Sequence, residues 1–410
     1  MGTFLKYLFA FFLVSFSADL PAQDIFTFEG NSKKIEIPFE YQNNFILVKI
    51  RLNEFIPLTF IFDTGAEYTI LAKKDFTDLL GVNYDREFKL IGADLKTTII
   101  AHLAKNIDIS LPGIKARSQN ILVLAKNYFN FEEYAGEQVD GILGADFFRH
   151  FIVKIDYKRR KITLLNPKET EIPKGYTSYP IKIKSGKPFI DNNIFLRDSL
   201  SIPAEFLIDT GAGLSLLLYT NTHPDFKLPE KTVTGNIGIG LGGFMEGYLG
   251  RIKSLNLTPY SFSNIITNFQ ELPQVTLDST LLVSRDGLIG NGVLSRFTVM
   301  IDYYRSQLYL KPRKKYNRKF AYDRSGIITI ASGKDLKDFE IKDILPNSPA
   351  AEAGLLPGDR IIKVSGIPKA FLSLPTINKK LMGRIGKKKK VVVKRKGERL
   401  VFQFRLKKLI

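Results

Sequence analysis

Apolar residues in the first 310 positions gather in short runs that Gly, Pro, Asn or Asp interrupt. Short apolar runs with this punctuation are typical of β-strands. The expected strands are Phe45–Leu52, 58–62, 99–103, 152–155, 162–165, 204–208 and 308–310. Only three short segments favour helix: 73–80, 145–150 and 293–297. The pattern therefore predicts a mainly β protein.

The strand-and-loop pattern occurs twice. Three blocks recur at an offset of 146 residues: 59–66 with 205–212, 140–144 with 286–290, and 151–157 with 297–303. A period of this length is too long for a solenoid repeat and has the size of a domain. We therefore expect two homologous lobes, residues 23–174 and 175–318.

Each copy places Asp-Thr-Gly directly after an apolar strand, at Asp63 and at Asp209. A single Asp in such a turn is usually structural. Two lobes related by a pseudo-twofold axis, however, can bring the two carboxyl groups face to face. At about 3 Å and an effective dielectric of about 20, two charged carboxylates repel by roughly 5 kcal/mol, or about 4 pKa units. The pair would keep one proton, so a water between them would meet a base and an acid.

The composition excludes several other chemistries. The chain has no Cys and three His, with no His-Glu-x-x-His pair and no Gly-x-Ser-x-Gly. Catalysis would therefore rest on carboxylates. Asp140, Asp156, Asp286 and Asp302 also recur in both copies, but we interpret them as turn and strand-end residues. We expect structural or surface roles for the three histidines, His102, His150 and His223.

With these motifs, the chain resembles the pepsin/retropepsin superfamily of aspartic proteases, and is most similar to bacterial two-lobed members with a C-terminal PDZ domain. The resemblance rests on Asp-Thr-Gly-Ala at 63–66 and 209–212, and on apolar-apolar-Gly at 142–144 and 288–290. It implies two pepsin/retropepsin-like β-barrel lobes in one chain, a monomer, and no metal or cofactor.

The resemblance also implies roles for individual residues. Asp63 and Asp209 would activate the water that attacks a peptide carbonyl of a polypeptide substrate. The residues supporting their loops would be Thr64, Gly65, Ala66, Thr210, Gly211 and Ala212. Thr64 and Thr210 would join the loops by hydrogen bonds, and the apolar-apolar-Gly elements would support them from behind.

Ala66 and Ala212 stand where pepsins usually carry a hydroxyl residue. A hydroxyl there would hydrogen-bond the charged carboxylate and lower its pKa. With Ala in both lobes, we expect activity at weakly acidic to near-neutral pH, and a rate optimum below about pH 3.5 would contradict this.

Two segments are candidates for the flap hairpin that covers substrate in this family: 89–103 and the glycine-rich 235–250. The sequence does not say which one moves. The second contains Gly-x-Gly-x-x-Gly at 238–243. No helix pattern follows it, so we favour a flexible hairpin over a dinucleotide site.

The net charge of +19 belongs to the last hundred residues, because 311–410 contain 27 Lys and Arg but 8 Asp and Glu. This asymmetry indicates a separate module, residues 320–410. Its Ser-Pro-Ala-x-x-Ala-Gly-Leu-x-Pro-Gly-Asp, at 348–359, resembles a PDZ domain. PDZ domains bind peptide termini or extended segments by strand addition. The resemblance would place the carboxylate-binding loop and first groove strand at Ser325, Gly326, Ile327 and Ile328, and the groove helix at 375–385.

Basic runs at 387–390 and 394–396 have no accompanying nucleic-acid motif. We interpret them as a solvated basic face that could attract anionic surfaces, and we expect no nucleic-acid partner.

The N-terminus has the order of an export signal, with Lys6, an apolar run over 7–16, and small residues up to Ala22. An uncleaved anchor is the alternative. We expect residues 1–22 to be removed and the protein to reach the periplasm or the outside of a Gram-negative-type cell. Two rival functions stay open: a noncatalytic peptide-binding envelope adaptor, and a basic surface tether.

Overall fold

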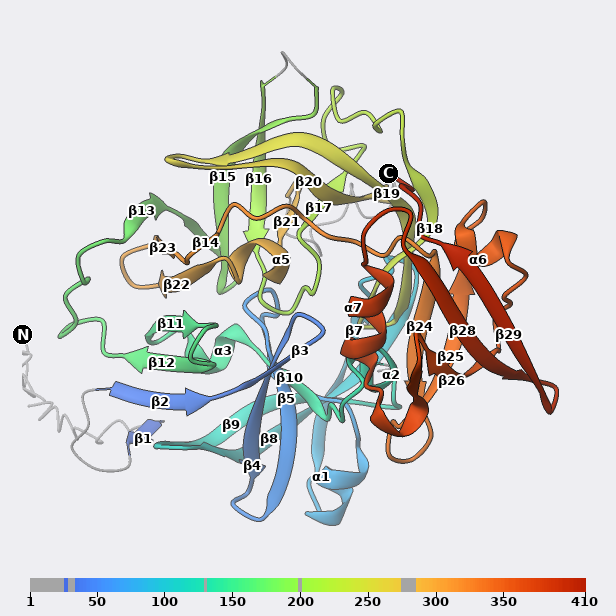
Figure 1. Cartoon of the computed structure of the whole chain (residues 1–410). Coiled ribbons are helices and arrows are strands. Elements are labelled where there is room, and N and C mark those ends of the chain that lie inside the picture. The colour runs from blue at the N-terminus through green and yellow to red at the C-terminus, as the bar shows by residue number, and fades with distance from the viewer. Residues whose placement is uncertain (1–25, 29–33, 129–130, 198–200, 274–284) are drawn as a thin grey trace, which may run out of the picture.

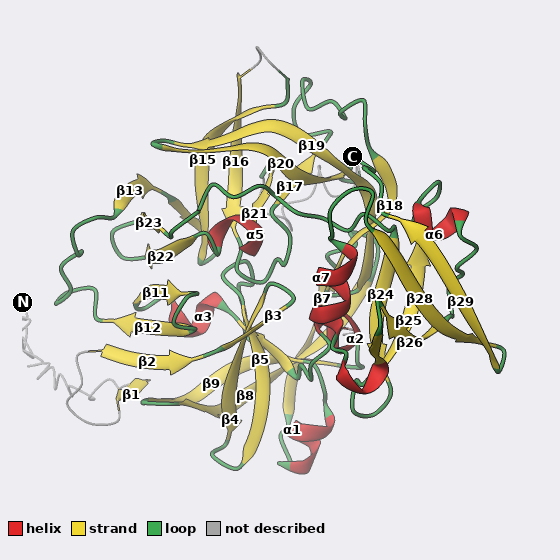
Figure 2. Cartoon of the chain, in the orientation of Figure 1, coloured by secondary structure: helices red, strands yellow, loops and turns green. Residues whose placement is uncertain are grey.

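The computed structural model describes residues 26–28, 34–128, 131–197, 201–273 and 285–410 (Figure 1). The expected export signal, 1–22, lies outside the described residues. Strands dominate and the helices are short (Figure 2), which confirms the mainly β prediction.

A nine-stranded sheet forms the first lobe. Its strands are β1 (Phe26–Phe28), β3 (Glu40–Gln42), β4 (Phe45–Leu52), β5 (Ile56–Phe62), β6 (Ile70–Leu71), β7 (Tyr84–Ile91), β8 (Thr98–Leu111), β9 (Ile114–Leu124) and β10 (Gly141–Leu143). Strand β10 pairs in parallel with β5 and antiparallel with β6, so it lies between them. Three short helices belong to this lobe: α1 (Asp75–Leu79), α2 (Phe131–Ala135) and α3 (Ala145–Phe148).

An eight-stranded sheet forms the second lobe. Its strands are β14 (Lys182–Lys184), β15 (Lys187–Phe195), β16 (Ser201–Ile208), β17 (Leu216–Tyr219), β18 (Val233–Gly240), β19 (Gly243–Leu257), β20 (Tyr260–Gln270) and β21 (Gly287–Ile289). Strand β21 pairs in parallel with β16 and antiparallel with β17, as β10 does in the first lobe.

A six-stranded sheet joins the lobes, in the order β13-β23-β22-β11-β12-β2. Its strands are β2 (Lys34–Pro38), β11 (Ile152–Asp156), β12 (Lys161–Leu165), β13 (Thr177–Pro180), β22 (Phe297–Asp302) and β23 (Gln307–Pro312). At its centre β11 pairs antiparallel with β22, and Lys154 lies opposite Met300. These two residues are 146 positions apart, so the pseudo-twofold axis passes through this pair.

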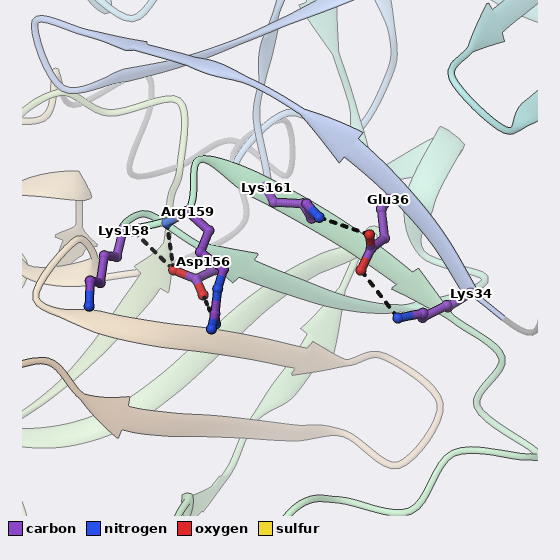
Figure 3. Close-up of polar contacts among 6 residues, drawn as sticks. All are labelled: Lys34, Glu36, Asp156, Lys158, Arg159 and Lys161. Carbon is purple, nitrogen blue, oxygen red and sulfur yellow. Dashed lines mark hydrogen bonds and ion pairs between the residues drawn. The ribbon is translucent and has the colours of Figure 1, made fainter.

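Charged side chains form ion pairs and hydrogen bonds on the first-lobe side of the joining sheet. Figure 3 shows Glu36 on β2 between Lys161, at 2.8 Å, and Lys34, at 3.3 Å. Asp156 ends β11 and accepts hydrogen bonds from the backbone N–H groups of Lys158 and Arg159, both at 3.0 Å. In the second lobe Asp302 accepts from the Arg305 N–H at 2.9 Å in the same way. Both aspartates therefore hold turns.

The C-terminal module has a separate six-stranded sheet with its own apolar core. Its strands are β24 (Ile327–Ser332), β25 (Asp338–Ile344), β26 (Arg360–Val364), β27 (Ile367–Pro368), β28 (Lys388–Arg395) and β29 (Glu398–Arg405). Its helices are α6 (Pro349–Glu352), the 3₁₀ turn η1 (Lys369–Phe371) and α7 (Leu374–Leu381). Strand β24 lies at the edge of the sheet beside α7, as a peptide groove requires.

Four details differ from the sequence predictions. Helix α2 lies outside the three segments predicted as helix in the first 310 residues. Helix α5 (Asn291–Leu294) ends before the predicted limit of 297, because Phe297 already pairs with Pro312 in the joining sheet. Helix α7 begins after the Ser373 cap and ends at Leu381, before the predicted limit of 385. Lys389, expected on a solvated face, is 2% exposed because β28 alternates between core and solvent.

Candidate active site

The two Asp-Thr-Gly loops follow equivalent strands. β5 ends at Phe62 directly before Asp63, and β16 ends at Ile208 directly before Asp209. The Asp63 N–H donates to the Leu143 carbonyl at 3.1 Å, and the Asp209 N–H to the Ile289 carbonyl at 3.0 Å. These acceptors lie on β10 and β21, so the apolar-apolar-Gly elements hold the loops from behind.

The structure brings the two aspartates together. A Cβ added to Gly65 would lie 2.7 Å from the Asp209 Cγ, and one on Gly211 would overlap the Asp63 carboxyl group. Only glycine leaves room for the opposite carboxyl group at each position. The two carboxyl groups therefore lie close to each other, and their negative charges oppose each other.

Each loop also donates to its own carboxylate. Asp63 Oδ1 accepts from the N–H of Gly65, at 2.7 Å, and of Ala66, at 3.2 Å. Asp209 Oδ1 accepts from the N–H of Gly211, at 2.8 Å. The alanines at positions 66 and 212 offer no hydroxyl, so donation from these loops comes from the backbone alone.

Burial is the largest influence on both pKa values. Burial and then the negative charge of Asp209 raise the pKa of Asp63 well above its usual value. Burial also raises the pKa of Asp209, while the charge of Arg285 and the hydrogen bond from the Gly211 N–H lower it. The two carboxyl groups are therefore expected to titrate as a coupled pair in which one of them keeps its proton.

Thr64 and Thr210 form four hydrogen bonds across the axis, and both are fully buried. Each N–H donates to the other residue's Oγ1 at 3.0 Å. The Thr64 hydroxyl donates to the Ile208 carbonyl at 2.7 Å, and the Thr210 hydroxyl to the Phe62 carbonyl at 2.9 Å. Each loop is therefore fastened to the strand that leads into the other.

The recurring Asp140 and Asp286 have equivalent structural positions. Asp140 Oδ2 accepts from the Thr59 N–H at 2.9 Å, and Asp286 Oδ2 accepts from the Glu205 N–H at 2.8 Å. Each therefore binds the strand that carries the candidate catalytic residue, away from the carboxyl pair.

Sequence reasoning missed three residues near the pair. Asn291 is fully buried and its Nδ2 donates to the Thr210 carbonyl at 2.6 Å and to the Asn44 carbonyl at 2.7 Å. The repeat could have drawn attention to it, because lobe one has Ala145 at the equivalent position. The charges of Arg285 and Lys187 also interact with the pair. No local motif marks these two cations.

Both candidate flaps are hairpins and their tips meet. One is β7–β8 and the other is β18–β19, whose tip contains the Gly-x-Gly-x-x-Gly. The Ala93 N–H of the first tip donates to the Leu241 carbonyl of the second at 2.6 Å. Lys96 pairs with Glu246 at 2.7 Å. A Cβ on Gly240 would overlap that of Ala93, so the contact depends on this glycine.

The predicted peptide-binding residues lie on the C-terminal module, apart from the carboxyl pair. Ser325 and Gly326 form the loop before β24, and Ile327 and Ile328 begin that strand. The loop is next to the end of α7, because the Arg324 N–H donates to the Leu381 carbonyl at 3.3 Å.

Other site types receive no support within the described ranges. No group of three or more His, Cys, Asp or Glu side chains there could hold a metal ion. No helix in the described part of the chain is long and apolar enough to cross a membrane. The three histidines pack against aromatic rings, His102 on Tyr84, His150 on Phe26 and His223 on Phe226.

Comparison with known families identifies two parts of the chain. Residues 48–147 match the family described as aspartyl protease, and residues 340–395 match the PDZ domain family. A search of curated proteins found no match. The family matches confirm the combination of an aspartyl protease domain with a C-terminal PDZ domain.

Proposed function

We propose that this protein is an aspartic endopeptidase whose catalytic residues are Asp63 and Asp209. The single observation that carries the proposal is the half-buried carboxyl pair that two symmetry-related loops bring close together. The match of residues 48–147 to aspartyl proteases supports peptide hydrolysis as the reaction. The β7–β8 and β18–β19 hairpins, whose tips meet, would cover an extended substrate.

The proposed reaction follows from the shared proton. Asp209 takes a proton from the water, whose oxygen attacks the peptide carbonyl carbon, while Asp63 gives its proton to the carbonyl oxygen. In the resulting diol, Asp209 returns a proton to the amide nitrogen and the C–N bond breaks. Asp63 regains its proton from the diol hydroxyl. Both carboxyl groups then have their starting protonation states.

The proposal extends to the rest of the chain. Two lobes, 23–174 and 175–318, form the protease, and the PDZ module, 320–410, recruits or orients peptide substrates. The export signal, removed at about residue 22, would deliver a monomer to the periplasm or cell exterior.

The direct test compares the chain with Asp63→Asn and Asp209→Asn, using a quenched fluorescent peptide library. We expect each change to reduce kcat at least about a thousandfold, because each removes an acid or base. Asp225→Asn is the matched control, since Asp225 is exposed on a loop of the second lobe. A pepstatin-type inhibitor should also block cleavage.

Hydrolysis that survives Asp63→Asn or Asp209→Asn would contradict the assignment of these two residues as catalytic. If the unmodified chain cleaves no peptide at any pH, the noncatalytic adaptor is the better description.

A further inference from the structure

The PDZ loop differs from a free carboxylate site, because its N–H groups already have acceptors within the chain. The N–H groups of Ser325 and Gly326 donate to Asp323 Oδ1, at 2.9 and 2.7 Å. The Ile327 N–H donates to the Ser325 Oγ at 3.2 Å. A ligand carboxylate needs such donors. Here Asp323, an aspartate of the loop itself, accepts the hydrogen bonds that a ligand carboxylate would need.

The second oxygen of Asp323 strengthens this point. Asp323 Oδ2 is buried and has no hydrogen-bond partner among the described residues. Burial raises the pKa of Asp323, while hydrogen bonds from Ser325 and Gly326 lower it. A ligand carboxylate beside it would add a second negative charge to a poorly solvated site. A group that donates a hydrogen bond would instead satisfy Oδ2.

A cavity of about 130 Å³ lies beside Asp323. The PDZ module contributes Ile327 and Leu345 to its wall, and the stem of the β18–β19 hairpin contributes Val233, Ile237 and Leu249. A cavity of about 150 Å³ can hold benzene, so this one has room for one apolar side chain. The cavity is thus mainly apolar and has Asp323 in its wall, which suits an apolar residue of a peptide that brings no carboxylate with it.

A segment from within the chain also lies against β24 and α7, the two elements that border the PDZ groove. Helix α2 of the first lobe contacts the edge strand β24. In the turn after it, a Cβ on Gly136 would lie 3.0 Å from the Leu374 Cβ, at the start of α7. Residues 131–136 therefore contact both β24 and the start of α7 without presenting a chain end, and Figure 1 shows α2 near these two elements.

From these observations we infer that the PDZ module takes apolar segments from within a polypeptide and rejects free C-terminal carboxylates, with Asp323 as the residue that sets this choice. The inference refines the peptide-recruiting role in the proposed function. It implies that substrates are recognised along their length, as in unfolded or looped chains, and not by their tails.

The test uses the full-length chain with Asp209→Asn, which prevents cleavage. The probes are two fluorescein-labelled pools of random decapeptides that end in Leu, Ile, Val or Phe. The pools differ only in a free carboxylate or a carboxamide at the C-terminus. Fluorescence anisotropy measures the binding of each pool, and we expect the carboxamide pool to bind at least as well as the acid pool.

Asp323→Asn should change this preference. The new amide can still accept from Ser325 and Gly326 through its oxygen, while its NH₂ offers a donor where Oδ2 stood. The acid-to-amide binding ratio should rise about tenfold, since the change removes a charge and adds a donor. Asp335→Asn is the matched control, because Asp335 is exposed between β24 and β25.

A preference for the acid pool by the chain with Asp323 intact, or binding of neither pool, would overturn the inference. This comparison does not require the Asp323 variant to fold. Hydrolysis by the chain with Asp209 intact is measured separately. An inactive chain that prefers carboxamides would contradict the proposed catalysis alone, and an active chain that prefers acids would contradict this inference alone.

Discussion

At the scale of single residues, small side chains set the properties of the carboxyl pair. Gly65 and Gly211 leave room for the opposite carboxyl group, and Ala66 and Ala212 leave each carboxylate with backbone donors only. Burial therefore acts on the pair without a hydroxyl to oppose it.

The first prediction concerns pH. Activity should appear as Asp209 loses its proton and disappear as Asp63 loses its proton, because the reaction needs one of each form. Both pKa values are raised, so both limbs of the pH–rate profile should lie above those expected for ordinary aspartates. Ala212→Ser should add a donor to the charged form and move the acidic limb down by about one pH unit.

The pH dependence of kcat/KM measures this shift. Ala204→Ser is a suitable control, because Ala204 lies on β16, the strand that leads into the Asp209 loop, and not in the loop itself. An unchanged acidic limb in Ala212→Ser would show that the hydroxyl does not reach the carboxylate.

The second prediction concerns Thr64. Thr64→Val keeps the shape but removes the hydroxyl, which leaves the Thr210 N–H and the Ile208 carbonyl without their present partner. An unsatisfied buried group costs about 1–3 kcal/mol, so thermal unfolding should occur several degrees lower. Thr64→Ser should stay close to the unmodified chain, because it keeps the hydroxyl. Equal melting temperatures for the Val and Ser variants would count against this role.

The sequence was informative about the acidic residues and less so about their surroundings. The repeat brings Asp63 and Asp209 into equivalent positions, so their pairing follows from symmetry alone. Asn291 breaks the repeat, and Asp323 lies outside it. Their hydrogen bonds depend on backbone groups that are distant in sequence or on a local loop conformation, and no residue pattern encodes either.

At the scale of secondary structure elements, the two hairpins that meet at their tips are the main feature. Their long strands give each hairpin a backbone hydrogen-bond ladder of its own. The tip contact adds the bond between Ala93 and Leu241 and the exposed Lys96–Glu246 pair. An exposed ion pair contributes about 0–1 kcal/mol, so close backbone packing matters more than the charges.

The third prediction separates these contributions. Gly240→Ala should push the tips apart, because the new Cβ would overlap that of Ala93. We expect a severalfold rise in KM for peptide substrates with a smaller effect on stability. The double change Gly240→Ala with Ala93→Gly removes the overlap and should restore KM. If the double variant behaves like Gly240→Ala, the effect does not arise from this contact.

The strand pattern predicted both hairpins as candidates, but it could not predict that their tips touch. Strand content follows from local alternation and glycine placement. A contact between two tips depends on how the lobes face each other, which the joining sheet fixes. The end of α5 depends on such a distant contact as well. The helix ends early because β22 begins to pair with β23 at Phe297.

At the scale of the whole molecule, charge is divided between the modules. Residues 311–410 contain the entire net charge of +19, while the preceding 310 residues are balanced. The exposed side chains of Lys388, Lys390 and Lys394 lie on β28 and face solvent, whereas Lys389 points into the module. Attraction to anionic surfaces should therefore come from the PDZ module.

The fourth prediction tests this division with anionic phospholipid vesicles. Reversing Lys388, Lys390 and Lys394 to Glu should weaken partitioning about a hundredfold at low salt, at ~1 kcal/mol for each lysine. Reversing Lys158, Lys168 and Lys227, exposed residues of the two lobes, is the matched control. Higher salt should weaken binding of the unmodified chain. Equal losses of vesicle binding in both triple variants would show that the position of the lysines does not matter.

The domain order and the mainly β class could be read from the repeat, the strand pattern and the charge asymmetry. The position of the PDZ module against the lobes could not. Phe320, Tyr322 and Ile410 pack into the core shared by the lobes, and this contact joins residues almost a hundred positions apart. Apolar residues of this kind do not reveal which core they will enter.

The cavity beside Asp323 has one further consequence, because its wall includes the stem of a hairpin whose tip meets the other flap. A peptide in this cavity and closure of the hairpins over the candidate active site would therefore involve the same strands, β18 and β19. If a bound peptide shifts that hairpin toward its closed position, a substrate held there must tighten the grip on the peptide by the same factor. Thermodynamic reciprocity would then make peptide binding at the PDZ module and substrate binding between the hairpins two measures of the same coupling free energy.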